Sequence, residues 1–246
     1  MGLGLGLGVT LSSSVEGFVD PSSVSDLSLW LDNGVGVTGA QWNDSSGNNN
    51  HITQSTGGEQ ATETDGGLDF EGNNNDHYDL TTGIDIGGSN PFTIFVVLKI
   101  ESFDPYPSDG TQTQNTLLGV SGSANDRFLE IQTDSQIRYR QTGGAAVLKF
   151  SASTPFATNT KMLLTIVKDS SRNLVIRKNG SVLTQASSTG LPVANGVFVA
   201  NQFGGRSSNP DRDFDGIIYE FLLYEKECSA SELNNIETHL RSEHGL

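Results

Sequence analysis

The chain has 246 residues with 29 acidic and 14 basic side chains, a formal charge of −15, and no Lys or Arg before Lys99. Because Lys and Arg bind phosphate groups, this balance argues against nucleic acid and an anionic membrane surface as partners. The single cysteine excludes an internal disulfide framework, and no apolar run approaches the ~18 residues that predict a membrane span. No basic segment precedes the N-terminal apolar residues, so no signal peptide is expected.

The N-terminus alternates Gly with aliphatic residues. In an extended segment, the period of two places Leu3, Leu5, Leu7 and Val9 on one face. Residues 1–24 are therefore predicted to be an arm and linker, and residues 25–246 a single domain. The arm is either a disordered tail or a strand that docks on a neighbouring subunit, and we predict the assembly role.

Short apolar runs separated by turn clusters fill most of the remaining chain. The predicted strands are Leu27–Leu31, Leu68–Phe70, Phe92–Ile100, Thr116–Val120, Phe128–Ile131, Ile137–Gln141, Ala146–Phe150, Lys161–Lys168, Leu174–Lys178, Ser181–Gln185, Gly196–Asn201 and Gly216–Tyr224. Phe92–Ile100 is apolar on both faces, which predicts a central strand. Asn179-Gly180 predicts a tight hairpin. The regular spacing predicts an all-β sandwich or barrel.

One helix is expected at the C-terminus. Ser229 and Glu232 form a capping-box pattern, and Gly245 marks the end. The apolar positions that share one face are Leu233, Ile236 and Leu240. We expect this helix to cover the edge or the end of the sandwich.

These landmarks, in this order, resemble the laminin-G-like (concanavalin A-like lectin/glucanase) superfamily. The similar segments are Leu29-Trp30-Leu31, Asp44–Asn48, Leu68–Gly72, the Phe92 strand, Val175–Gly180, and Phe214–Tyr224 with the Ser-x-x-Glu helix that follows. The resemblance implies a jelly roll of two antiparallel sheets with one short C-terminal helix. Members include glycan-binding modules, glycosidases, adhesion domains and virion proteins, so the fold does not fix the function.

Catalysis is not expected. Glycoside hydrolysis needs two carboxylates at a defined separation, and hydrolases of this fold carry them as Glu-x-Asp-x-x-Glu. The nearest segment, Glu130–Asp134, lacks the middle Asp and the last Glu. No Gly-x-Ser-x-Gly and no metal-type His or Cys spacing occurs, so no catalytic residue is predicted.

Glycan binding requires flat aromatic rings beside amide, carboxylate or guanidinium groups. The predicted ligand-binding residues are Trp42, Asp44, His77, Tyr106, Arg138 and Arg140. Arg138 and Arg140 share one strand face, which would suit an acidic sugar. The alternatives are core packing for Trp42 and cross-strand salt bridges for the arginines.

Calcium is the one cofactor considered. Asp211–Gly216 matches the start of an EF-hand loop, but position 12 is Leu222 rather than Glu, so an EF-hand is rejected. Superfamily members often bind Ca²⁺ at the sandwich rim. The resemblance therefore implies a looser site formed by Asn74, Asp76, Asp211 and Asp213, with Asx-type turn caps as the alternative.

The predicted function is a non-catalytic virion surface, decoration or tail-associated structural protein of a bacteriophage, with a lectin-like sandwich that binds glycans. The composition, rich in Asn, Ser, Thr and Gly, and the Gly-Leu arm favour this hypothesis. Its partners would be other virion proteins and further copies of the chain, at the virion surface. A stand-alone, extracellular carbohydrate-binding or adhesion module is the first alternative, and a glycoside hydrolase is the second.

Overall fold

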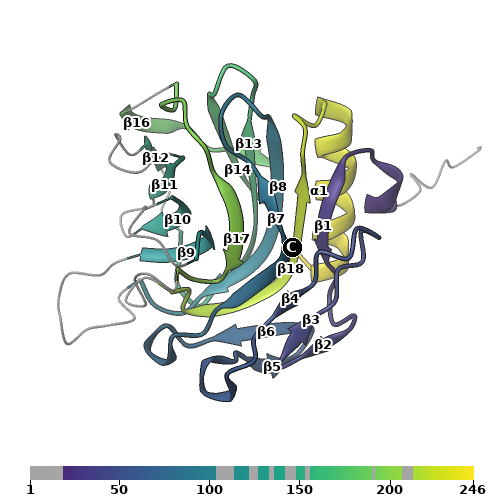
Figure 1. The fold of residues 1–246 in the computed structure, drawn as a ribbon. Coiled ribbons are helices and arrows are strands. Elements are labelled where there is room, and N and C mark those ends of the chain that lie inside the picture. Colours follow the sequence, from purple (N-terminus) through teal and green to yellow (C-terminus); the bar gives the residue numbers. More distant parts are fainter. Residues whose placement is uncertain are drawn as a thin grey trace, which may run out of the picture.

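The structure is a computed structural model that describes residues 19–103, 114–121, 127–132, 136–141, 148–152, 156–189, 192–206 and 213–246. Its described strands form two antiparallel sheets packed face to face, with one α-helix against the outside of the first sheet (Figure 1). The predicted two-sheet sandwich with one C-terminal helix is confirmed.

The first sheet contains eight strands. In spatial order they are β15 (Ser181–Val182), β14 (Leu174–Lys178), β13 (Lys161–Lys168), β8 (Phe92–Ile100), β18 (Gly216–Tyr224), β6 (Gly67–Phe70) and β5 (Thr62–Thr64), with β1 (Leu27–Leu31) beside β18. Both central residues of the Asn179-Gly180 turn have positive φ, 49° and 83°, which matches the predicted tight hairpin.

The second sheet contains ten strands. In spatial order they are β16 (Gln185–Thr189), β12 (Leu148–Ala152), β11 (Gln136–Arg140), β10 (Phe128–Gln132), β9 (Gln114–Gly119), β17 (Val199–Phe203), β7 (Tyr78–Asp85), β4 (Ile52–Thr53), β3 (Gln41–Trp42) and β2 (Val37–Thr38). Three short 3₁₀ helices complete the described elements: η1 (Pro21–Ser23), η2 (Gly57–Glu59) and η3 (Gly72–Asn74).

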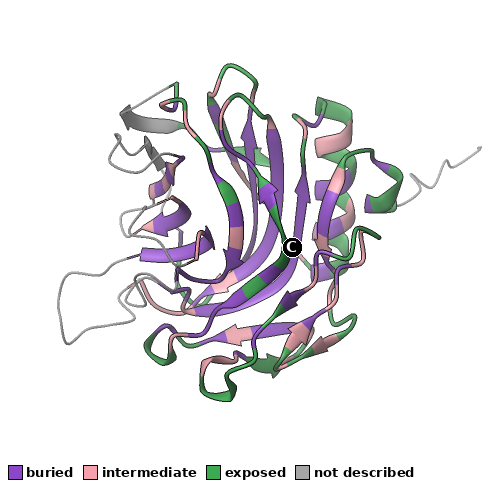
Figure 2. Cartoon of the chain, viewed as in Figure 1, coloured by how far each residue is buried: buried purple, intermediate pink, exposed green. Residues whose placement is uncertain are grey.

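The main core lies between the sheets, and strands such as β1 contribute alternate residues to it, here Leu29 and Leu31. A second apolar cluster lies on the outer face of the first sheet, where Phe95 and Leu222 pack with Ile236 and Leu240 of the helix. Strands β8 and β18 are therefore buried almost throughout their length (Figure 2). The central position predicted for Phe92–Ile100 is confirmed.

Helix α1 (Ala230–His244) begins at Ser229 with both hydrogen bonds of the capping box and ends at Gly245, which is left-handed (φ 68°). It covers the outer face of the first sheet. The expectation that it covers an edge or end of the sandwich is wrong, because the outer sides of β8 and β18 are apolar and need a cover. Buried Glu237 accepts hydrogen bonds from Arg177 Nε (2.7 Å) and Thr165 Oγ1 (2.8 Å) and fastens α1 to the sheet.

The sheets differ from the predicted strands in several places, two of which involve whole strands. The segment predicted as one strand, Ser181–Gln185, ends at Val182, and Gln185 opens a strand of the other sheet. Strand β7 was not predicted, because its sequence Tyr-Asp-Leu-Thr-Thr-Gly-Ile-Asp contains Gly and two Asp residues, which are rare in strands. Its buried positions, Tyr78, Leu80 and Ile84, still face the core.

Candidate functional site

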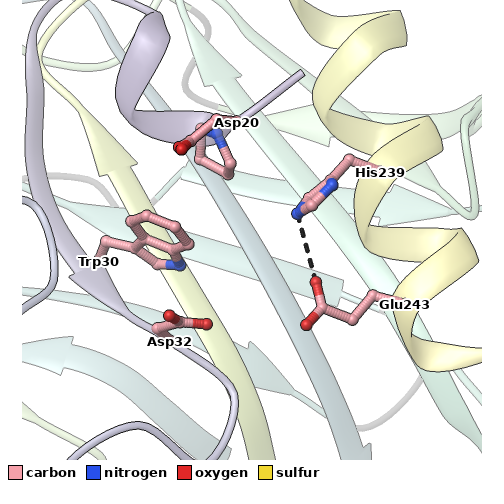
Figure 3. A pocket seen from close by; sticks show the side chains of 6 residues that line it. Asp20, Trp30, Asp32, His239 and Glu243 are labelled. Carbon is pink, nitrogen blue, oxygen red and sulfur yellow. Dashed lines mark ion pairs between the residues drawn. The ribbon is translucent and has the colours of Figure 1, made fainter. Parts of the chain in front are cut away.

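A cavity of about 300 Å³ opens where the N-terminal part of the described chain meets helix α1. We call it the Trp30 pocket and define it by its lining residues, Asp20, Pro21, Trp30, Asp32, His239 and Glu243 (Figure 3). Asp20 caps η1, Trp30 lies on β1 with Asp32 directly after it, and His239 and Glu243 come from α1. The pocket therefore joins segments that are about 200 residues apart in the sequence.

The alternation along β1 explains one wall. Leu29 and Leu31 face the core and are fully buried, so Trp30 and Asp32 face the opposite side of the strand. On α1, His239 and Glu243 are one turn apart, and His239 Nε2 lies 3.2 Å from Glu243 Oε2.

A β-bulge brings a further carboxylate to the pocket. The register between β18 and β8 shifts between Ile218 and Glu220, so Glu220 pairs with outward-facing Val97 rather than continuing the core-facing alternation of Ile218. Glu220 is fully buried, and its Oε1 accepts a hydrogen bond from Trp30 Nε1 at 2.9 Å. Its Oε2 lies 2.7 Å from His244 Nε2.

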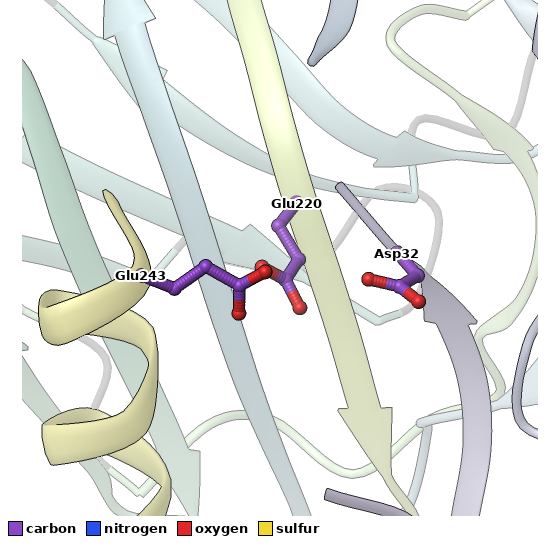
Figure 4. Close-up of side chains that lie close together, drawn as sticks. All are labelled: Asp32, Glu220 and Glu243. Atoms are coloured by element: carbon purple, nitrogen blue, oxygen red, sulfur yellow. The ribbon is translucent and has the colours of Figure 1, made fainter. Parts of the chain in front are cut away.

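Three carboxylates converge at this place. Oxygen atoms of Asp32, Glu220 and Glu243 all lie within 4.8 Å of one another (Figure 4). Burial raises the pKa of Asp32 to about 6, and the negative charges of Glu220 and Glu243 act in the same direction. The arrangement therefore favours a positively charged or hydrogen-bond-donating ligand.

Two predicted ligand residues, Trp42 and Asp44, do not line the pocket but hydrogen-bond to the backbone of residues that do. Trp42 is fully buried, and its Nε1 donates to the backbone oxygen of Asp32 at 3.0 Å. Asp44 is buried, and its carboxylate accepts hydrogen bonds from the backbone nitrogens of Trp30 (2.9 Å) and Asn50 (2.9 Å). A buried ring offers no face to a sugar, so the position of Trp42 does not support direct stacking, and core packing was the correct alternative.

The predicted arginines lie on the second sheet, on the outer face of β10 and β11. Arg138 Nη1 is 2.7 Å from Oε1 of buried Glu130, its direct cross-strand neighbour. Arg206, which no sequence motif marks, is almost fully buried, with Nη2 3.6 Å from Glu130 Oε2 and its guanidinium over the Phe128 ring. Arg138 thus makes the cross-strand salt bridge that was its alternative, while ligand binding by Arg138 and Arg140 stays a prediction.

His77 is buried beside the predicted calcium residues, with Nδ1 2.8 Å from the backbone oxygen of Asn75. Asp76 is 2% exposed. Its Oδ2 accepts from Glu71 N at 2.8 Å, and its Oδ1 has no hydrogen-bond partner. Burial raises the pKa of Asp76. A buried carboxylate oxygen of this kind fits a cation ligand, so a calcium site stays a prediction.

The other predicted calcium residues are less informative. Asn74 is exposed at the end of η3, and Asp213 Oδ1 accepts from Arg206 N at 3.0 Å. Asp211, Tyr106 and the arm residues Leu3, Leu5, Leu7 and Val9 lie outside the described residues. Within the described ranges, no helix is both long and apolar enough to cross a bilayer.

Residues 71–234 match the Laminin_G_3 family model, described as concanavalin A-like lectin/glucanases superfamily. The chain belongs to this superfamily. All six residues that line the Trp30 pocket lie outside the matched range, whereas Glu220 lies inside it. No curated protein matches the chain.

Solved structures share the fold of the superfamily at low sequence identity. Trypanosoma rangeli sialidase has 16% identity and a TM-score of 0.56, over 89% of this chain and 33% of the sialidase chain. The binding domain of Paraclostridial Mosquitocidal Protein 1 has 16% identity and a TM-score of 0.59, over 91% of this chain and 53% of that chain. A third structure is domain 4 of AbnA, a GH43 extracellular arabinanase from Geobacillus stearothermophilus, in complex with arabinotriose. It has 15% identity and a TM-score of 0.55, over 86% of this chain and 98% of that chain. This chain thus spans a third of the sialidase, and these similarities concern the fold.

Proposed function

We propose that this chain is a non-catalytic carbohydrate-binding module and that the Trp30 pocket is its ligand site. The observation that carries the proposal is an aromatic ring in the wall of a cavity of about 300 Å³ beside the convergent carboxylates of Asp32 and Glu243. Sugar rings have an apolar face that packs on an indole and hydroxyl groups that donate to carboxylates. The arabinotriose bound to the arabinanase domain and the sialic acid bound to the sialidase support this class of ligand.

A glycan array followed by calorimetry tests the proposal. Trp30→Ala should abolish binding, because it removes the stacking face and the hydrogen bond to Glu220. Arg140→Gln, on the outer face of β11, is the control and should bind as the wild type does. Retained binding in Trp30→Ala with loss in Arg140→Gln would instead move the site to the second sheet.

Glycoside hydrolysis is the alternative function that the spacing of the pocket carboxylates favours. Retaining glycosidases hold two carboxyl groups about 5–5.5 Å apart and keep one protonated near neutral pH. The spacing of Asp32 and Glu243 and the raised pKa of Asp32 approach these conditions. We expect no hydrolysis of β-glucan, agar, carrageenan or alginate. Turnover that Asp32→Asn abolishes would show that the module is an enzyme.

The biological setting that we propose is the surface or tail of a bacteriophage virion, with other virion proteins and further copies of the chain as partners. The support comes from the sequence: the Gly-Leu arm and a composition with few Lys and many Asn, Ser, Thr and Gly residues. Deleting residues 2–9 should leave the melting temperature within a few degrees and abolish incorporation into particles, as measured by mass spectrometry of purified virions. Full incorporation of the truncated chain would contradict the virion role of the arm.

A further inference from the structure

Resting on the proposed function, we infer that the Trp30 pocket selects saccharides that carry a free amino group in its protonated, ammonium form. The pocket combines an aromatic face with carboxylates from several elements. This combination distinguishes a cationic sugar from a neutral or an acidic one.

The charges around the cavity come from every element that forms it. They are Asp20 before η1, Asp32 after β1, Glu220 on β18, and His239, Glu243 and His244 on α1. Among the residues that the structure describes, no Lys or Arg lines the cavity. His239 Nε2 lies 3.2 Å from Glu243 and His244 Nε2 lies 2.7 Å from Glu220, so each of these two histidines is closest to one carboxylate of the group. Like charges this close repel one another, and an ammonium group relieves the repulsion where a hydroxyl group does not.

Hydrogen bonds fix the orientation of Trp30 before any ligand binds. Its Nε1–H donates to buried Glu220, and the backbone nitrogen of Trp30 donates to Asp44, so both ends of the residue are fixed. A cation over an indole face is attracted by the ring quadrupole, and Trp is the strongest partner among the aromatic side chains. A ring that is already oriented loses little conformational freedom on binding.

The selectivity is a property of this chain rather than of the superfamily match. All six lining residues lie outside residues 71–234, in the two segments that flank the matched range. Three of them are acidic, and the first 98 residues contain no Lys or Arg that would compensate them.

Three trisaccharides that differ only at carbon 2 of each ring test the inference: the glucosamine trimer (ammonium), the N-acetylglucosamine trimer (acetamide) and cellotriose (hydroxyl). At pH 7 and in EDTA, calorimetry should show the glucosamine trimer binding at least tenfold more tightly than the other two. The preference should decrease as salt is added.

Two charge-matched double variants separate pocket recognition from general attraction to an acidic protein. Asp32→Asn with Glu243→Gln should reduce the preference for the glucosamine trimer over cellotriose to less than about twofold. Asp65→Asn with Glu227→Gln removes two exposed carboxylates away from the pocket and should leave the preference intact. Near-UV circular dichroism confirms that both variants fold.

The outcomes distinguish the two proposals. Equal binding of all three trimers, or equal loss of preference in both double variants, overturns the ammonium inference and leaves carbohydrate binding standing. Binding of other glycans on the array without the glucosamine trimer also overturns the inference. Absence of any glycan binding by the wild type overturns the proposed function together with it.

Discussion

The Trp30 pocket and the outer face of β10 and β11 both gather ionisable side chains, but only the second balances them. On β10, Glu130 lies between Arg138 and Arg206, at 2.7 and 3.6 Å, and all three side chains are largely buried. At the pocket, Asp32 and Glu243 of the lining lie close to buried Glu220, and the nearby basic side chains among the described residues are histidines. Removing one member of a balanced buried cluster leaves an uncompensated charge and destabilises the fold, whereas an unbalanced cluster beside a cavity leaves room for the charge of a ligand.

The largest expected effect is at Glu130. Glu130→Gln removes the charge between two buried guanidinium groups and should lower the free energy of unfolding by about 3–5 kcal/mol. Gln132→Ala, two residues farther along the same face of β10, should change it by no more than about 0.5 kcal/mol. Urea unfolding measures both. A change below about 1 kcal/mol in Glu130→Gln would mean that this cluster is not a structural charge balance.

Lys168 is a buried base that has no ion-paired carboxylate among the described residues, unlike the two arginines beside Glu130, and its hydrogen bonds go mainly to backbone oxygens. Its Nζ donates to the backbone oxygens of Ile86 (2.7 Å) and Gly88 (3.1 Å), and burial lowers its pKa from 10.5 to about 8. Because the pKa of Lys168 is lower in the folded chain, the unfolded chain binds the proton more tightly. The contribution of Lys168 to the free energy of unfolding therefore decreases as pH falls from 10.5 to about 8, and it recovers as pH rises towards 10.5.

Wild type should therefore gain about 1–2 kcal/mol relative to Lys168→Met between pH 7.5 and pH 9, as measured by urea unfolding at each pH. The difference between the two proteins removes the contributions of other groups that titrate in this range. Parallel pH profiles of the two proteins would show that Lys168 keeps an ordinary pKa.

Calcium should have an intermediate effect. If Asp76 Oδ1 is a ligand, about 5 mM Ca²⁺ acting on a site with a Kd of about 1 mM adds about 1 kcal/mol to the free energy of unfolding. Asp76→Asn should remove this gain, and the same concentration of Mg²⁺ serves as the control for ionic strength. Identical melting curves in Ca²⁺ and in EDTA would exclude the site.

The smallest effect is expected at Asp32. Its pKa is raised in the folded chain, so the folded chain binds the proton more tightly than the unfolded chain does. The contribution of protonated Asp32 to the free energy of unfolding is therefore present below about pH 4 and lost as pH rises through about 6. Because Asp32 is only half-buried, Asn at this position should stabilise the chain by less than about 1 kcal/mol at pH 7.5 and by nothing at pH 4. Thermal unfolding at both pH values measures this. A destabilised Asp32→Asn at pH 7.5 would mean that the pocket carboxylates are not in electrostatic conflict.

The long strands and the helix could be predicted because their signals are local. Strands β8, β13, β14 and β18 begin and end at the predicted residues, since each is a continuous or alternating apolar run between polar turns. The capping box at Ser229 and the left-handed Gly245 likewise fix the ends of α1. Sheet membership and the helix-covered face could not be predicted, because they depend on which runs pair across long sequence separations.

Local sequence patterns are enough to predict an all-β sandwich with one helix, and they indicate the segment around Trp42 and Asp44. The burial of Trp42 and the exposure of Trp30 to a cavity become clear from the packed fold alone, because both residues lie in similar short apolar strands. Likewise, only the bulge in β18 turns Glu220 towards Trp30 and His244. A one-residue change of register moves a side chain from one face of a sheet to the other, and strand pairing sets the register.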